Sequence, residues 1–176
     1  MNWEKHKGFT IVELLIVIVV IAILAAITII SYNGIQNRAK NQQVVTAVAT
    51  YYKALQAYSV DNADTFPTAY GCLGSTTAYN GDPCYQSSNT YNHNATLNNA
   101  LAQYIGPNPP TTPMDGITFP DNATAKGIFY HTASGFGGRY LGFIIYGSSS
   151  CPGIAGAQTS TSSPAGSNIY CRILVR

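Results

Sequence analysis

The chain has 176 residues, enough for one domain with an extension, and only 9% of them are charged. Because a typical soluble protein has about a quarter of its residues charged, Asn, Thr, Ser, Gly and Tyr must supply much of the polar surface, as suits a protein outside the cytosol. The formal charge is +2, and no cluster of basic residues gives a signal for nucleic-acid binding.

Residues 9–30 form an apolar segment whose polar members are Thr10, Glu13 and Thr28. A helix of about 20 such residues spans a bilayer. Lys5 and Lys7 precede the segment, so the positive-inside rule leaves the N-terminus in the cytoplasm. We therefore expect a single-pass protein of the cytoplasmic membrane, with the lipid bilayer as its first partner and the C-terminus outside.

Glu13 is unexpected in this segment, because no polar residue occurs from Leu14 to Ile27. A charged side chain in hydrocarbon costs on the order of 3 kcal/mol, so the carboxylate implies a partner. A cleaved signal peptide and a plain signal anchor both remain as interpretations of the basic start and apolar run. Neither explains Glu13 or the placement of Gly8 before Phe9. A third interpretation makes Glu13 a polar residue at the membrane interface.

A basic leader that ends at Gly8, followed by Phe9, three residues and Glu13, resembles the prepilin-peptidase site of type IV pilins and related proteins. The resemblance is specific over residues 5–38. It implies that prepilin peptidase cleaves after Gly8, that the cytoplasmic leader 1–8 is removed, and that Phe9 becomes N-methylated. It also implies polymerisation with identical or other pilin subunits by an inner-membrane assembly machinery, which gives an extracellular pilus.

The spacing of Phe9 and Glu13 suits filament assembly. Cleavage would create an ammonium group on Phe9, and Glu13 lies one helical turn further on the same face. In the membrane, the Glu13 carboxylate can face its own N-terminus, and in a filament it can meet the Phe9 ammonium of a neighbouring subunit. Either pairing lowers the cost of burying both charges. Phe9 and Glu13 are therefore the predicted assembly residues.

The helical pattern continues beyond the apolar segment. We predict one spine helix over residues 9–60, with 9–30 in the membrane or filament core. Gly34 is its weak point, since an interior glycine costs about 1 kcal/mol relative to alanine, and a kink or break is expected there if anywhere. An apolar stripe with helical spacing predicts packing of the distal half on a sheet, and it consists of Val44, Val48, Tyr51, Leu55 and Tyr58.

Residues 61–176 are expected to form a globular head, with variable loops first and an antiparallel sheet at the C-terminal end. A short helix is predicted at 95–105, capped by Asn94 and ended by Gly106 and Pro107. The fold class is thus α+β, with a long N-terminal spine helix packed on a small sheet, which resembles the pilin fold. Strands are predicted at 127–131, 139–146 and 169–175, with a hairpin turn at 133–138.

Four cysteines follow the apolar segment, which indicates an oxidising compartment and allows three pairings. We favour Cys72–Cys84 and Cys151–Cys171. The second bridge would close a loop of small residues that has no packing of its own, and it resembles the disulfide-bounded C-terminal loop of many pilins. A zinc site is the alternative, but the cysteines lack the close spacing of zinc ligands.

The sequence gives no support for an enzyme, a cofactor or a metal site. His93 and His131 lie in unrelated contexts, and no catalytic triad can be assembled around the serines at 148–150. Scattered aspartates are interpreted as loop and cap residues in preference to calcium ligands, and they are Asp61, Asp64, Asp82, Asp115 and Asp121.

We interpret the chain as a structural subunit of a type IV pilus-like surface filament that serves adhesion, twitching motility or DNA uptake. One alternative is a pseudopilin of a type II secretion system. The resemblance favours a pilin, since the main pseudopilins often use calcium where pilins use a disulfide such as Cys151–Cys171. The other alternative is a monomeric membrane-anchored adhesin or binding domain, which predicts an uncleaved N-terminus and no need for Glu13.

Overall fold

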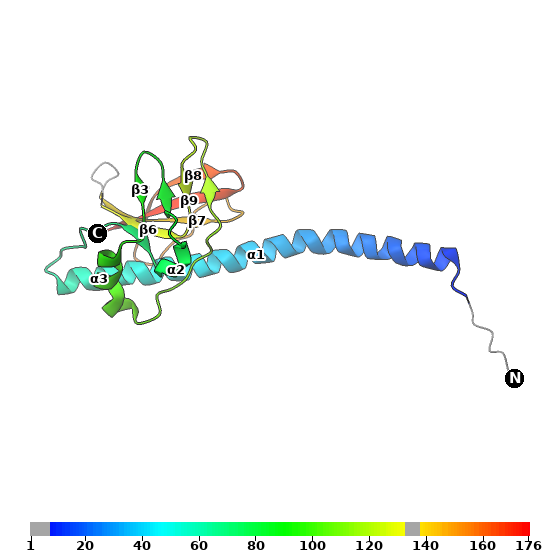
Figure 1. Cartoon of the computed structure of the whole chain (residues 1–176), viewed down its shortest axis with the longest axis horizontal. Coiled ribbons are helices and arrows are strands. Elements are labelled where there is room, and N and C mark those ends of the chain that lie inside the picture. The colour runs from blue at the N-terminus through cyan, green and yellow to red at the C-terminus, as the bar shows by residue number, and fades with distance from the viewer. Residues whose placement is uncertain (1–7, 133–137) are drawn as a thin grey trace. The chain divides into compact units, whose positions relative to one another are not determined.

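The computed structural model describes residues 8–132 and 138–176, without the side chains of 29–31 and 159–162. The chain divides into two compact units, Met1–Gln36 and Asn37–Arg176, and helix α1 (Ile11–Asp61) has residues in both (Figure 1). The predicted α+β class is confirmed, because the long N-terminal helix is followed by two antiparallel sheets.

Helix α1 matches the predicted spine helix to within two residues at its start and one at its end. It continues through Gly34, where the sequence predicted a weak point. At the C-terminal end, the Asp64 amide donates to the Ser59 carbonyl at 2.8 Å, and Ala63 adopts a left-handed conformation with φ 52°. This is the hydrogen bond of a Schellman ending, which satisfies a carbonyl that the helix leaves free.

The predicted stripe of α1 forms part of the core of unit 37–176. Val44, Val48, Tyr51 and Leu55 are each at most 2% exposed, and Tyr58 packs partly buried against the same cluster. Polar contacts reinforce this packing, since the Tyr52 hydroxyl donates to the Gly156 carbonyl at 2.7 Å. Burying such side chains stabilises the unit by about 1.5–3 kcal/mol for each large apolar residue.

The main sheet has five antiparallel strands in the order β1-β6-β7-β9-β8, and it lies along one side of this part of α1 (Figure 1). Three of its strands were predicted, because their stretches contain β-branched or aromatic residues and are flanked by turns. The other two, β1 and β8, were not. The strands are β1 (Gly71–Leu73), β6 (Ile128–His131), β7 (Arg139–Ile145), β8 (Gln158–Ala165) and β9 (Asn168–Val175).

The region between Cys151 and Cys171 corrects the prediction of a loop without packing of its own. Strand β8 runs through it and pairs antiparallel with β9 from Gln158↔Leu174 to Ala165↔Asn168. Its run of Ser and Thr carries no apolar alternation, so nothing in the pattern marked it as a strand. Backbone pairing with β9 determines its conformation, and Pro164 is tolerated because β8 is an edge strand.

A second, four-stranded sheet occupies the region expected to hold only variable loops around one helix. Its strands have two residues each, too short for a period-2 pattern to be recognised. Their order is β3-β2-β5-β4, and they are β2 (Tyr85–Gln86), β3 (Thr90–Tyr91), β4 (Ile117–Thr118) and β5 (Thr124–Ala125). The Cys72–Cys84 bridge joins the two sheets, since Cys72 lies in β1 and Cys84 directly precedes β2.

Helix α3 (Ala95–Ile105) has the predicted bounds, and a four-residue helix α2 (Thr76–Tyr79) precedes it. The Asn94 side chain accepts a hydrogen bond from the Leu97 amide at 3.1 Å, so the predicted cap is confirmed. The Tyr104 hydroxyl donates to Asp61 Oδ2 at 2.9 Å, which joins α3 to the end of α1. The hairpin turn predicted at 133–138 falls mostly outside the described residues, although β6 and β7 are antiparallel neighbours.

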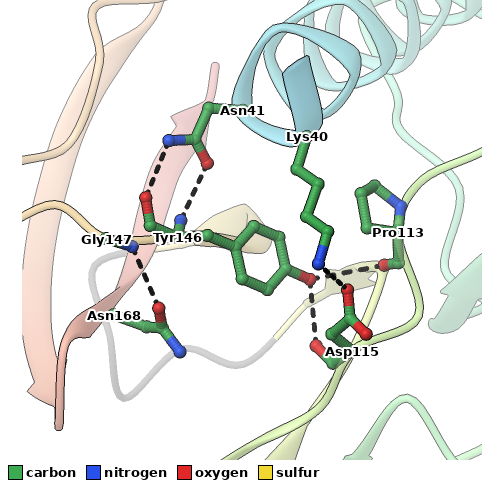
Figure 2. A network of polar contacts seen from close by, with 7 residues as sticks. All are labelled: Lys40, Asn41, Pro113, Asp115, Tyr146, Gly147 and Asn168. Atoms are coloured by element: carbon green, nitrogen blue, oxygen red, sulfur yellow. Dashed lines mark hydrogen bonds and ion pairs between the residues drawn. The ribbon is translucent and has the colours of Figure 1, made fainter. Parts of the chain in front are cut away.

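Asn41 of α1 binds the free end of β7 (Figure 2). Its Nδ2 donates to the Tyr146 carbonyl and its Oδ1 accepts from the Tyr146 amide, both at 2.8 Å. The side chain thus replaces a neighbouring strand just beyond β7. Gly147 then donates its amide to Asn168 Oδ1 at 3.0 Å, at the start of β9.

The Tyr146 side chain extends the same network toward a loop (Figure 2). Its hydroxyl donates to the Asp115 carbonyl at 2.9 Å, and burial raises the pKa of this hydroxyl well above its usual value. Lys40 Nζ lies 2.7 Å from Asp115 Oδ2, an ion pair whose side chains are 35% and 59% exposed. Helix α1, the end of β7 and the loop before β4 therefore share one set of contacts.

Replacement of Asn41 should destabilise the compact unit. Asn41→Leu keeps the shape of the side chain but leaves the amide and carbonyl of Tyr146 unsatisfied, so we expect the free energy of unfolding to fall by about 2–4 kcal/mol. Near-ultraviolet circular dichroism during urea unfolding of the full chain in detergent measures the change. Lys40→Met is the matched control, because its exposed ion pair should contribute less than about 1 kcal/mol. Equal losses in both variants would contradict the prediction.

Candidate functional site: the N-terminal segment

The first part of α1 is apolar on every side. All residues from Ile11 to Thr28 are exposed within the chain, including Ile11 at 86% and Val19 at 48%. A helix that is apolar all round is covered by lipid or by other protein. By length and composition, α1 is the one helix within the described residues that could cross a membrane.

Glu13 is bound by Thr10 at the start of this helix. Glu13 Oε2 accepts from the Thr10 amide at 2.8 Å and from the Thr10 hydroxyl at 2.7 Å. The Thr10 hydroxyl oxygen accepts from the Glu13 amide at 3.2 Å. These reciprocal bonds form a capping box, which satisfies two amides that the first turn of a helix leaves free.

The capping box explains why the helix begins later than predicted. Thr10 takes the capping position, so Gly8 and Phe9 precede the helix and are exposed, Phe9 at 80%. The Gly8–Phe9 peptide bond, where cleavage is predicted, therefore lies in exposed, non-helical chain. Sequence reasoning considered the spacing of Phe9 and Glu13 but missed Thr10, although Thr followed three residues later by Glu is the signature of a capping box.

The other candidate residues have structural roles in the compact unit. The structure contains the Cys72–Cys84 and Cys151–Cys171 bridges, the pairing favoured from the sequence. His93 Nε2 lies 2.9 Å from the Gly74 carbonyl oxygen.

The aspartates are likewise engaged in separate places. Asp82 pairs with Lys126 at 2.7 Å, and Asp121 accepts from the Ala123 amide at 3.2 Å in a turn. Within the described residues, no three His, Cys, Asp or Glu side chains gather in a group that could hold a metal ion.

Comparison with known proteins agrees with the N-terminal geometry. The family model described as "Prokaryotic N-terminal methylation motif" matches residues 3–29. Core protein G of the type II secretion system from Klebsiella michiganensis is 34% identical over 68 residues, which are 39% of this chain and 47% of that protein. The same-named protein of Escherichia coli K12 is 34% identical over 59 residues, 34% of this chain and 41% of that protein.

A pilus protein is also among the relatives. The type IV wide pilus major component PilA4 of Thermus thermophilus is 43% identical over 59 residues, 34% of this chain and 45% of that protein. The chain thus spans less than half the length of each of these relatives. No solved structure matches the chain significantly. The methylation motif and homology to both secretion pseudopilins and a type IV pilin are therefore established for this chain.

Loss of the Thr10 hydroxyl should loosen the start of α1. Thr10→Val preserves the side-chain shape but removes two of the three capping hydrogen bonds, at a cost of about 1 kcal/mol. Amide hydrogen exchange at Glu13 in detergent micelles should accelerate about fivefold. Thr28→Val is the control, since it removes only a bond from the hydroxyl to the Ala25 carbonyl inside the helix. Unchanged exchange at Glu13 would show that the capping box contributes nothing.

Proposed function

We propose that this chain is a structural subunit of a type IV pilus-like filament. It is held in the cytoplasmic membrane as a precursor, processed between Gly8 and Phe9 by a prepilin peptidase, and polymerised through its N-terminal helix by an inner-membrane machinery. The observation that carries the proposal is a single carboxylate, Glu13, beside the proposed new N-terminus of a helix that is apolar all round. Adhesion, twitching motility and DNA uptake are the uses of such a filament.

The membrane stage follows from the exposed apolar residues of α1. In lipid, these residues need no protein partner, and the capping box gives Glu13 hydrogen bonds within its own chain. Lys5 and Lys7 favour a cytoplasmic N-terminus and place unit 37–176 outside. The disulfide bridges of that unit suit the oxidising side of the membrane.

The filament stage follows from what cleavage would change. Removal of residues 1–8 would convert the Phe9 amide into an ammonium, and N-methylation would keep its charge. Both capping bonds to the carboxylate use Oε2, so Oε1 can accept from the ammonium of a neighbouring subunit without loss of the cap. Contact between apolar helices then replaces lipid, and each buried ammonium gains a carboxylate partner.

A second candidate function is that of a pseudopilin in a type II secretion system. The similarity to core protein G of Klebsiella and Escherichia favours it. Both functions use the same N-terminal cleavage site and helix. Any difference between them must therefore lie in unit 37–176. Deletion of the gene should abolish surface filaments if the chain is a pilin, and should instead retain exported enzymes in the periplasm if it is a pseudopilin.

The proposed cleavage predicts a specific mature N-terminus. Mass spectrometry of the exported protein should find Phe9 as the first residue, with one additional methyl group. Gly8→Val should leave the full-length precursor in the membrane, because a branched side chain beside the scissile bond obstructs the peptidase. Gly34→Val, at the other glycine of this unit, is the control and should be processed normally. A mature N-terminus at Met1 or near Ala26 would refute the cleavage and favour an anchored monomer or a signal peptide.

The role of Glu13 predicts a defect in assembly and not in insertion. Glu13→Ala makes the segment more apolar, so membrane insertion should be unchanged or improved. Each buried ammonium would lose its counterion, and breaking a buried pair costs about 3–5 kcal/mol, so filament yield should collapse. Glu13→Gln removes the negative charge but keeps a side-chain oxygen that can accept the hydrogen bonds from Thr10, so it tests the charge without loss of the cap.

The assay compares protein in the membrane fraction with filaments sheared from the cell surface. Loss of filaments in both variants assigns the effect to the charge, and loss in Glu13→Ala alone would assign it to the cap. Normal filament yield in both would remove the main support for the proposed function.

A further inference from the structure

A cavity of about 440 Å³ opens between the two sheets of the compact unit, well away in sequence from the N-terminal segment. Its volume falls within the roughly 300–1,000 Å³ of small-molecule sites. Side chains from both sheets and from the turn after β4 meet there. The aromatic and cationic ones are Tyr85, Tyr91, Phe119, Tyr140, Tyr170 and Arg172.

A glycine leaves room for a pair of stacked aromatic rings, one of which, Tyr170, lines this cavity. Gly142 of β7 lies between Phe129 of β6 and Arg172 of β9 in the strand register. A Cβ atom on Gly142 would come within 2.5 Å of Phe129 Cζ and 2.6 Å of the Tyr170 hydroxyl oxygen. Because that space is free, the Phe129 and Tyr170 rings stack across it with centroids 5.9 Å apart and planes at 10°.

The aromatic rings that line the cavity differ in their exposure to solvent. Tyr91, Tyr140 and Tyr170 are buried, whereas Tyr85 and Phe119 are half-buried at the cavity walls. Tyr85 stacks on Tyr91 with centroids 5.2 Å apart, and Phe119 meets Tyr170 edge-on at 5.6 Å. These contacts hold the walls in place without a ligand, so binding would cost little ordering entropy.

Polar groups of both charges line the same space. The Arg172 guanidinium lies 5.5 Å from the Tyr140 ring and 5.7 Å from the Tyr170 ring, within the range of cation–π contacts. Asp121 and Asn89 are exposed lining residues, and the Asp121 turn is fixed by its bond to the Ala123 amide. The lining thus combines aromatic surface with one cation, one anion and neutral hydrogen-bonding groups.

The combination of aromatic, charged and neutral polar lining residues favours some classes of ligand over others. A nucleic-acid strand needs a groove with an excess of positive charge, and here the single arginine is balanced by an aspartate. A purely apolar ligand would leave the charged groups desolvated without partners. A sugar ring presents apolar C–H faces to aromatic rings and hydroxyl groups to carboxylate, amide and guanidinium groups, so it satisfies both parts of the lining.

We propose that this cavity binds a neutral saccharide, with a pyranose ring against the aromatic walls at Tyr85 and Phe119 and its hydroxyl groups bound by Asp121 and Arg172. The proposal does not depend on filament assembly, because all of these residues belong to unit 37–176. It would give the exposed part of the chain a means to attach to glycan-covered surfaces.

Saturation-transfer difference NMR tests the proposal on the full chain. The chain is kept in a polyoxyethylene detergent, because maltoside or glucoside head groups would compete for the cavity. The probes are glucose, galactose, N-acetylglucosamine and N-acetylgalactosamine, with glucuronic acid and an oligothymidine strand as separate arms. Phe119→Leu removes an aromatic wall, and Asp121→Asn removes the charge while keeping an acceptor for the Ala123 amide. Asp64→Asn, in the exposed turn after α1, is the matched control.

At least one neutral sugar should bind saturably to the wild type. Its affinity should fall about tenfold in Phe119→Leu and at least severalfold in Asp121→Asn, and stay unchanged in Asp64→Asn. If Phe119→Leu unfolds by circular dichroism, Asp121→Asn decides alone. The proposal is overturned if no neutral sugar binds, if Asp121→Asn binds as well as the wild type, or if only the oligonucleotide or only glucuronic acid binds. Dimerisation through this face that Phe119→Leu abolishes, without sugar binding, would likewise overturn it.

Discussion

One carboxylate in the otherwise apolar first part of α1 is the constraint on which the proposed life cycle depends. In the uncleaved chain, Thr10 supplies Glu13 with two hydrogen bonds and makes the residue tolerable at the edge of a membrane. Those bonds compensate for lost hydration. We propose that in a polymer the Phe9 ammonium of a neighbouring subunit adds a counterion, so that the carboxylate is better satisfied there than in lipid.

The remaining strands and loops pack around the second half of α1. The second half of α1 contributes its stripe from Val44 to Leu55 to the core, and Asn41 binds the end of β7 through two backbone hydrogen bonds. Two disulfide bridges hold the segments that are poorest in apolar residues, one between the sheets and one beside the edge strand β8. Unit 37–176 is thus held together around the second part of α1, and the aromatic cavity lies wholly within this unit.

Features of the fold that a short stretch of sequence specifies could be predicted, and features that depend on contacts between separate stretches could not. The α1 stripe, the Asn94 cap of α3 and the β-branched and aromatic residues of β6, β7 and β9 are local signals, and they were recognised in the sequence. Strand β8 is a run of Ser and Thr at a sheet edge, so only its pairing with β9 makes it a strand. The two-residue strands β2 to β5 are likewise set by tertiary pairing, and the cavity is lined by residues that both sheets and the turn after β4 bring together. Thr10 and Glu13 have the spacing of a capping box, so this feature could have been predicted from the sequence.

The most direct test of the central claim is a cryo-electron-microscopy structure of filaments sheared from the surface of cells that make this protein. We expect the N-terminal nitrogen of Phe9 in one subunit to lie within about 4 Å of a Glu13 carboxylate oxygen in its neighbour, with Thr10 still bound to the same carboxylate. A filament in which Glu13 contacts only its own Thr10 while the Phe9 ammonium is bound elsewhere would contradict it. So would a filament whose subunits retain residues 1–8.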